Sequence, residues 1–266
     1  MKKRLGIIGC GKMASAMLAR WLETGALAAD DVIACTGSAA SAERVAATFG
    51  VACGTDVAAV IAGAQTVLLA VKPQLRAGAL GDLRPQPNQR WLSVLAGVPT
   101  VALEMQLPGA RVLRLMPNTP VRLGRGLVAL TPGTTATPED VVETRTLLAP
   151  LGTVVDVVES HVDAFTAVAG SGPAYVFLFL EALAEAGMAQ GLDPQTSALL
   201  AQETLLGAAL LAANAGRPPS ELRAEVTSKG GMTQAALHVF ASRAWPETVT
   251  EAVAAAVARA AELARS

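Results

Sequence analysis

The 266-residue chain is poor in the residues that metal sites and acid–base catalysts most often use. It has two histidines, His161 and His238, and three widely spaced cysteines, Cys10, Cys35 and Cys53, with no Cys-x-x-Cys pair. This pattern argues against a zinc site and against a disulfide framework, and it favours buried free thiols. Any chemistry must therefore come from an organic cofactor or from non-metal side chains.

Aromatic residues make up only 3% of the chain, and the net charge is −1. Neither nucleic acid nor an anionic membrane is expected as a partner, which leaves small molecules. The apolar run after Lys2, Lys3 and Arg4 is too short for a secretory signal, and the most apolar later stretch, 176–180, ends at Glu181. We expect a cytoplasmic protein.

The first apolar run enters a Gly-x-Gly turn, and an apolar-periodic segment leaves it, as in the strand, turn and helix of a dinucleotide-binding unit. Gly9 permits the sharp turn, Gly11 lets a pyrophosphate approach the backbone, and small Ala14 lets the helix pack closely on the strand. The helix N-terminus would face the phosphates. A glycine turn in an ordinary α/β unit is the alternative. The predicted contacts are Ile8, Gly9, Cys10, Gly11, Lys12, Met13 and Ala14.

The end of the second predicted strand, 32–36, carries no carboxylate that could bind the ribose 2′-hydroxyl of NAD. It offers Thr36, Ser38 and Ser41 instead, with Arg44 one helical turn further on. Hydroxyls and an arginine favour a 2′-phosphate, and hence NADP over NAD. A plain surface loop would look similar.

Apolar runs alternate with helical patterns as far as residue 161, which predicts a Rossmann-type, doubly wound α/β sheet. Beyond that point every segment has helical spacing. We therefore expect an NADP-binding domain at 1–161 and an all-α domain at 162–266. The remaining predicted strands are 51–53, 66–71, 91–95, 111–116, 127–130 and 153–158.

The helical half places leucines on more than one helix face, as at Leu199, Leu200, Leu205 and Leu206. A helix that is apolar most of the way round requires burial on several sides, and a domain of about 100 residues supplies little of it. Self-association through this half is expected. One helix buried centrally in its own bundle is the alternative.

Five stretches of the chain carry the most specific motifs: Gly9–Ala14, Ala70–Gln74, Arg114–Pro120, Gly170–Tyr175 and Val226–Thr233. In this order they resemble the pyrroline-5-carboxylate reductase family. The resemblance covers almost the whole chain, and it implies a Rossmann domain followed by a dimerisation domain like the C-terminal domain of 6-phosphogluconate dehydrogenase. It also implies reduction of 1-pyrroline-5-carboxylate to L-proline by NADPH, with NADH as the alternative donor, in homodimers that in this family often form decamers as pentamers of dimers.

The resemblance also assigns cofactor contacts beyond the glycine turn. It places Asp56 near the adenosine, where an asparagine is common in the family, and Asn118 close to the reacting centre. Alternatives remain open, because Lys72 could be a solvated lysine and Asn118 could hold a purely structural turn. The contacts implied near the ribose and nicotinamide are Ala70, Val71, Lys72, Pro73, Ala96 and Gly97.

The substrate carboxylate needs a binding site, which we call the carboxylate seat and expect at 228–233. Gly230-Gly231 before a helix offers backbone N–H groups there as an anion nest. By analogy with the family, Ser228 and these N–H groups hold the carboxylate, and Thr233 hydrogen-bonds the imine nitrogen. Threonine is a weak acid, so we expect it to position the imine rather than protonate it. Alternatively, Ser228 and Thr233 only cap the helix.

The chain departs from the family pattern at two positions of this seat. Lys229 stands where proline is usual, and Met232 stands where the family has a small residue or threonine. Lys229 could add positive charge near the carboxylate or point into solvent. Met232 weakens the case for a second hydroxyl contact.

Two other functions fit the same architecture. Enzymes of the 3-hydroxyacid dehydrogenase group, of the 6-phosphogluconate dehydrogenase type, resemble one another in a catalytic lysine within the helix after the linker. That function is disfavoured here, because residues 167–181 contain no lysine. An NADP-sensing module without turnover is disfavoured by the seat at 228–233, which a sensor does not need.

Overall fold

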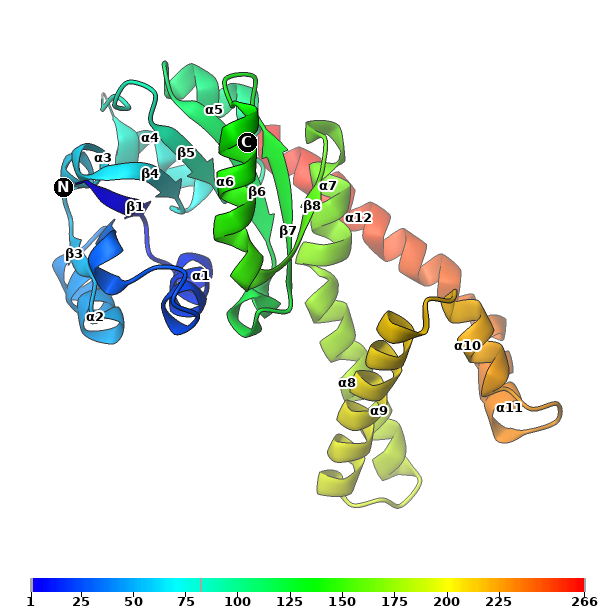
Figure 1. Cartoon of the computed structure of the whole chain (residues 1–266). Helices are drawn as coiled ribbons and strands as arrows, with labels where there is room; N and C mark the ends of the chain where they lie inside the picture. Colours follow the sequence, from blue (N-terminus) through cyan, green and yellow to red (C-terminus); the bar gives the residue numbers. More distant parts are fainter. Residues whose placement is uncertain (1, 82, 266) are drawn as a thin grey trace. The chain divides into compact units, whose positions relative to one another are not determined.

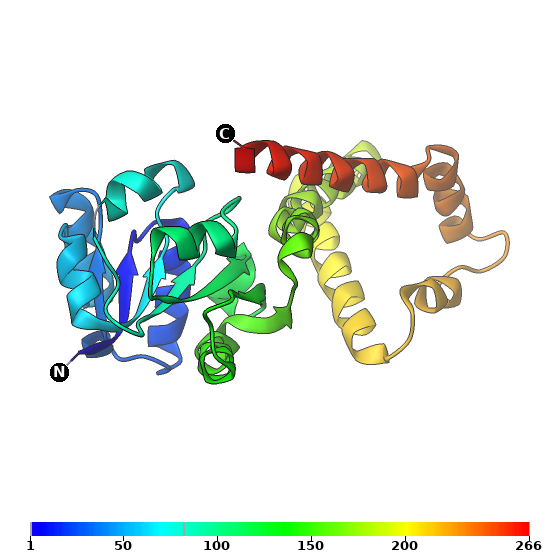
Figure 2. The same cartoon turned by 90° about the horizontal axis from the view of Figure 1, so that it is seen from above.

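The N-terminal part of the chain forms one eight-stranded sheet with helices on both faces (Figures 1 and 2). The computed structural model describes residues 2–81 and 83–265. The strand order is β3-β2-β1-β4-β5-β6-β7-β8. The strands are β1 (Lys3–Ile8), β2 (Val32–Cys35), β3 (Ala52–Gly54), β4 (Ala64–Leu69), β5 (Arg90–Ser93), β6 (Arg111–Pro117), β7 (Gly126–Pro132) and β8 (Gly152–Asp156).

Neighbouring strands are parallel except for β6 and β7, which are antiparallel. The segment between them contains only the 3₁₀ helix η3 (Thr119–Leu123), which is too short to cross over the sheet and return in parallel. The predicted Rossmann-type sheet is confirmed, and this hairpin is a feature that the alternating pattern did not reveal.

Helices cover the sheet because successive strand residues point to opposite faces. Leu5 and Ile7 of β1 join the apolar cluster on one face, whereas Ile8 joins the cluster on the other. Trp21 is fully buried in the first cluster, and its indole N–H donates to the Leu147 carbonyl oxygen at 2.7 Å. The helices of this part are α1 (Lys12–Glu23), α2 (Ala39–Phe49), α3 (Val57–Gly63), α4 (Arg76–Leu80), α5 (Thr100–Gln106), α6 (Pro138–Leu148) and α7 (Val162–Phe165).

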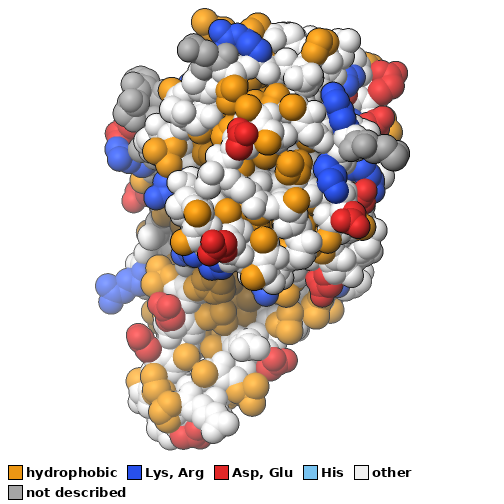
Figure 3. All heavy atoms as spheres, turned by 90° about the vertical axis from the view of Figure 1, so that its left-hand side faces the viewer, with side chains coloured by type: hydrophobic (Ala, Val, Ile, Leu, Met, Phe, Trp, Pro, Cys, Tyr) orange, Lys and Arg blue, Asp and Glu red, His pale blue; other side chains and the backbone are white. Residues whose placement is uncertain are grey.

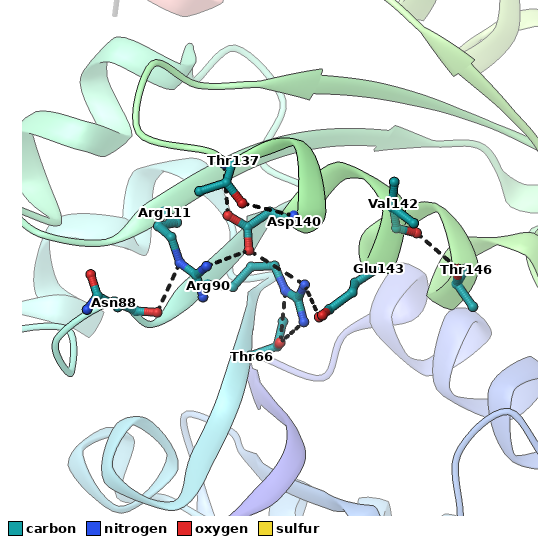
Figure 4. A network of polar contacts seen from close by, with 9 residues as sticks. All are labelled: Thr66, Asn88, Arg90, Arg111, Thr137, Asp140, Val142, Glu143 and Thr146. Atoms are coloured by element: carbon teal, nitrogen blue, oxygen red, sulfur yellow. Dashed lines mark hydrogen bonds and ion pairs between the residues drawn. The ribbon is translucent and has the colours of Figure 1, made fainter.

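A buried ionic network fixes α6 to the strand ends (Figure 4). The Asp140 carboxylate is 2% exposed and lies 3.0 Å from an Arg111 nitrogen and 3.7 Å from an Arg90 nitrogen. Asp140 also forms a capping box with Thr137 at the start of α6. One side chain therefore joins the helix start to β5 and β6.

The described residues form two compact units. The first comprises residues up to Gly170 and those from Val257 onward, and the second comprises Ser171–Ala256. The assignment of domains to 1–161 and 162–266 stays a prediction. The helices of the C-terminal half are α8 (Gly172–Ala189), α9 (Pro194–Ala215), α10 (Pro219–Glu225), α11 (Met232–Ser242) and α12 (Trp245–Arg265). The shorter helical turns, all before α8, are the 3₁₀ helices η1 (Ala29–Asp31), η2 (Pro73–Leu75), η4 (Ala149–Leu151) and η5 (Glu159–His161), and the π-helix η6 (Thr166–Gly170).

In the second unit, α8 and α9 pack as a helical hairpin, with little of either helix buried. Gly187 allows the close approach, because a Cβ there would lie 3.0 Å from the Ser197 hydroxyl oxygen. Leu199 and Leu211 remain 57% and 58% exposed. Figure 3 shows apolar side chains (orange) at the surface of this hairpin, in the lower part of the view. The alternative of a helix buried within its own bundle is therefore wrong for the single chain.

Candidate functional site

The turn between β1 and α1 brings three strand ends together. Gly9 has a φ of +88°, and a Cβ there would lie 2.8 Å from the backbone nitrogen of Val71. Its N–H donates to the Cys35 carbonyl oxygen at 2.9 Å, and the Ala70 N–H donates to the Ile8 carbonyl oxygen at 2.8 Å. The predicted residues Ile8, Gly9, Ala70 and Val71 thus lie side by side at the C-terminal edge of the sheet.

Gly11 has a different role in the same turn. Its φ is −81°, an ordinary value for any residue, and a Cβ there would meet no protein atom within 4 Å. The first N–H groups of α1 lie directly after it, and the first turn of a helix has no backbone partners for its N–H groups. This open space beside unpaired N–H groups fits a pyrophosphate.

A cavity of about 730 Å³ lies beside this helix start. The cavity brings Arg44 of α2 next to the predicted Cys10–Met13 turn. It also includes Thr119 and Arg122 of η3, which were not among the predicted cofactor contacts. Only the packing of η3 on α1 reveals them, because no local spacing connects residues so far apart. The full lining is Cys10, Gly11, Lys12, Met13, Ser15, Ala16, Arg44, Thr119 and Arg122.

The hydroxyl-rich segment after β2 is held mainly by its own contacts. The Thr36 hydroxyl donates to the Ser38 carbonyl oxygen at 3.0 Å, and the Ser38 hydroxyl accepts the Ser41 N–H at 3.3 Å as the cap of α2. Arg44 donates to the Ser41 hydroxyl at 3.1 Å and remains exposed. The segment therefore presents a guanidinium and hydroxyls, the groups predicted to receive a 2′-phosphate.

Asp56 lies elsewhere. Its carboxylate accepts the N–H groups of Ala58 at 2.8 Å and Ala59 at 3.3 Å, which makes it the cap of α3. It lines a separate cavity between β2, β3 and α3 rather than the one beside α1. The structure gives Asp56 a capping role, and its contact with the adenosine stays a prediction.

The other predicted cofactor residues follow β4, β5 and β6. Lys72 and Pro73 lie where η2 begins, with Lys72 exposed, and Gly97 has a φ of +70° in the turn after β5, next to Ala96. Asn118 is 6% exposed. Its amide nitrogen donates to the Ala169 carbonyl oxygen at 2.9 Å, and its amide oxygen accepts the Leu127 N–H at 2.8 Å. These bonds hold the turn, as in the structural alternative, and cofactor contact stays a prediction.

The three cysteines are free thiols. Burial raises the pKa of Cys10 and of Cys53, and it raises the pKa of Cys35 to about 11. All three are thus protonated near neutral pH, and none is suited to be a nucleophile.

The predicted substrate residues belong to the second unit. At the start of α11, Gly231 occupies the cap position without a side-chain cap, so the capping alternative for Ser228 and Thr233 is wrong. Gly230 has a φ of +74°, as a nest requires.

Two donors of the expected nest are engaged within the segment. The Gly230 N–H donates to the Gln234 side-chain oxygen at 2.6 Å, and the Gly231 N–H donates to the Ser228 carbonyl oxygen at 3.0 Å. A carboxylate would have to displace the Gln234 amide to reach Gly230. The N–H groups of Met232 and Thr233, in the first turn of α11, have no intrahelical partner, and Met232 is 92% exposed. The carboxylate seat stays a prediction.

A Rossmann-type sheet with an open glycine turn, followed by apolar helices, is typical of oxidoreductases that use a nicotinamide dinucleotide. Comparison with known proteins agrees with this class. Residues 4–97 match the family model described as NADP oxidoreductase, coenzyme F420-dependent, and residues 159–263 match the model described as pyrroline-5-carboxylate reductase dimerisation.

Relatives named pyrroline-5-carboxylate reductase align with almost the whole of this chain. The chain is 35% identical to the one from Synechocystis sp., covering 99% of both chains, and 36% identical to the one from Pseudomonas aeruginosa, covering 98% and 97%. The solved structure from Coxiella burnetii superposes with a TM-score of 0.90 at 31% identity, covering 99% of both chains. The chain belongs to the pyrroline-5-carboxylate reductase family, whose members are NAD(P)H-dependent enzymes.

The dimerisation match accounts for the apolar helices. By length and composition alone, two helical stretches among the described residues, Glu159–Ala189 and Pro194–Ala215, are long and apolar enough to cross a membrane. The expectation that apolar character ends at Glu181 was therefore too simple. Both stretches lie within the dimerisation match, and apolar faces that pair with a partner subunit produce the same composition.

Proposed function

We propose that the protein reduces 1-pyrroline-5-carboxylate to L-proline, with NADPH as the preferred hydride donor. The observation that carries the proposal is the 35% identity to a named reductase over 99% of both chains. It is supported by the open space at Gly11, which fits the dinucleotide. The alternatives of a hydroxyacid dehydrogenase and a nucleotide sensor have no comparable support.

The chain's own residues need to orient the substrate rather than ionise. A bound NADPH supplies the hydride, and a protonated cyclic imine is already a good hydride acceptor. Ser228 and the N–H groups at the start of α11 hold the carboxylate, and the Thr233 hydroxyl hydrogen-bonds the imine nitrogen. Positioning of this kind can supply a large part of a rate enhancement.

Preference for NADPH over NADH rests on the segment after β2. Arg44 and the hydroxyls of Thr36 and Ser38 belong to the segment expected to receive a ribose 2′-phosphate, and no carboxylate lies among residues 36–42, directly after β2, to favour the 2′-hydroxyl of NAD. In the ratio of kcat/KM for the two donors, we expect NADPH to be favoured by about tenfold or more, as one charged contact with the phosphate provides.

The test is NADPH oxidation with pyrroline-5-carboxylate by the wild type and by Ser228→Ala and Thr233→Ala. Loss of a hydrogen bond to a charged group should raise the KM for the imine about tenfold in Ser228→Ala, and Thr233→Ala should lower kcat. Thr227→Ala is the matched control, because the Thr227 hydroxyl donates to the Arg223 carbonyl oxygen in the last turn of α10, which the Thr227 side chain helps to close. Unchanged kinetics in both variants would refute the seat, and absence of turnover in the wild type would refute the reaction.

The apolar helices support an assembly proposal as well. We propose a cytoplasmic homodimer in which α8 and α9 are covered by the partner, and dimers that associate into a decamer. Sedimentation at micromolar concentration distinguishes the two assemblies by mass, and recovery in the soluble fraction without detergent tests the location.

A further inference from the structure

The cavity beside the glycine turn gathers three cations from separate elements. Lys12 begins α1, Arg44 lies on α2 and Arg122 lies in η3, and no carboxylate of residues 2–81 or 83–265 lines the cavity. Among the described residues, none of the three takes part in an ion pair. Cations gathered in one hollow without a counter-charge attract a multiply charged anion.

The segment that carries Arg122 is firmly anchored. Val121 is fully buried, and Gly124, at a φ of +67°, lies against the guanidinium of Arg20, where a Cβ would come within 2.6 Å of a nitrogen. Arg20 in turn donates to the Pro150 carbonyl oxygen at 3.1 Å. The backbone on both sides of Arg122 is therefore fixed, whereas its side chain is exposed at the cavity.

We propose that Arg122 binds a phosphate of the dinucleotide, so that η3 supplies a cation to the cofactor beside the start of α1. The proposal rests on the proposed function. A planar guanidinium presents a rigid fork of N–H donors that matches two phosphate oxygens, whereas an ammonium binds as a point charge without that fixed geometry. Arg44 is directed towards Ser41, in the segment assigned to the 2′-phosphate, which leaves Arg122 with Lys12 for the pyrophosphate.

The test compares Arg122→Gln with Arg125→Gln, a control that removes an exposed arginine from the same loop but outside the cavity. Dissociation constants for NADPH and NADH are measured by fluorescence titration, at low and moderate salt. We expect Arg122→Gln to weaken NADPH binding about tenfold, the loss of one charge-assisted contact, and to flatten its salt dependence. Arg125→Gln should bind within about twofold of the wild type. Arg122→Lys, which keeps the charge but not the fork, should lie between.

The outcomes separate this proposal from the proposed function. Equal weakening for NADPH and NADH supports contact with the pyrophosphate, and weakening for NADPH alone supports contact with the 2′-phosphate. If Arg122→Gln and Arg125→Gln bind equally tightly while the wild type reduces the imine, the role of Arg122 is wrong and the reductase assignment stands. If the wild type binds neither dinucleotide, both fail. Thermal melting of each variant verifies that it is folded.

Discussion

At the residue scale, two glycines of one turn have opposite structural requirements. Gly9 has a left-handed backbone and lies against Val71, whereas Gly11 has an ordinary φ and open space around it. A side chain at Gly9 would therefore disturb the fold, and a side chain at Gly11 would disturb only what binds there. This contrast allows cofactor binding to be separated from stability.

We expect Gly11→Ala to weaken NADPH binding at least tenfold, because a methyl group would occupy the space the pyrophosphate needs. Its free energy of unfolding should fall by no more than about 1 kcal/mol, since alanine is only a poorer helix cap than glycine. Fluorescence titration and urea unfolding measure the two quantities.

Gly9→Ala provides the comparison. The left-handed conformation costs an alanine about 1–2 kcal/mol, and the contact with Val71 adds to it. We expect a loss of unfolding free energy of more than about 2 kcal/mol, the larger of the two losses by a clear margin. If Gly11→Ala proved the less stable variant, the open space at Gly11 would be misassigned.

The sequence spacing predicted the sharp turn at Gly9 and the open backbone at Gly11, because both are local to a strand–turn–helix unit. It could not identify Arg122, whose place beside Lys12 depends on the packing of η3 against α1. The family resemblance placed Asp56 near the adenosine; the structure shows that its carboxylate caps α3, and the adenosine contact stays a prediction. Local pattern thus predicted the backbone of the site better than the side chains that surround it.

At the scale of elements, the strands were predicted from their apolar runs to within about two residues, as β4 and β5 illustrate. The antiparallel pairing of β6 and β7 was not predicted, because pairing direction depends on whether the connection is long enough to return the chain to the same edge of the sheet. The Asp140 network likewise joins residues from α6, β5 and β6 that have no sequence relation to one another.

Asp140→Asn tests that network. The carboxylate is almost completely buried between two guanidinium groups, so its neutralisation leaves Arg90 and Arg111 without their buried counter-charge (Figure 4). Breaking a buried pair of this kind costs about 3–5 kcal/mol when one partner is removed, and less here because the asparagine can still accept a hydrogen bond. We expect a loss of about 2–3 kcal/mol in urea unfolding.

Glu143→Gln is the matched control. Glu143 also pairs with Arg90, at 2.6 Å, but its side chain is 64% exposed. An exposed pair contributes at most about 1 kcal/mol, and we expect the smaller loss accordingly. Equal losses for the two variants would contradict the importance of burial. Neither residue lies near the predicted cofactor contacts, so kcat of the folded enzyme should be unchanged in both.

At the scale of the whole molecule, the apolar surface of α8 and α9 indicates that the single chain is incomplete. Leucines on α9 are about half exposed, although burial of one such side chain contributes about 1.5–3 kcal/mol. The dimerisation match covers the same residues. The free energy of this surface is therefore gained on association rather than on folding of one chain.

Leu211→Glu should shift the dimer to monomer. Leu211 is 58% exposed in one chain, so the single subunit can accept the charge there, but a carboxylate in an apolar interface loses its hydration without a partner. Met105→Glu makes the same change at an 81% exposed methionine of α5, outside the dimerisation match, and should leave the mass unchanged. Sedimentation velocity gives both masses, and circular dichroism verifies the helical content.

A Leu211→Glu protein that remained dimeric at low micromolar concentration would place the interface on other residues of the matched region. Because stability and association are linked by mass action, we expect the melting temperature of the wild type to rise with concentration and that of Leu211→Glu to be independent of it.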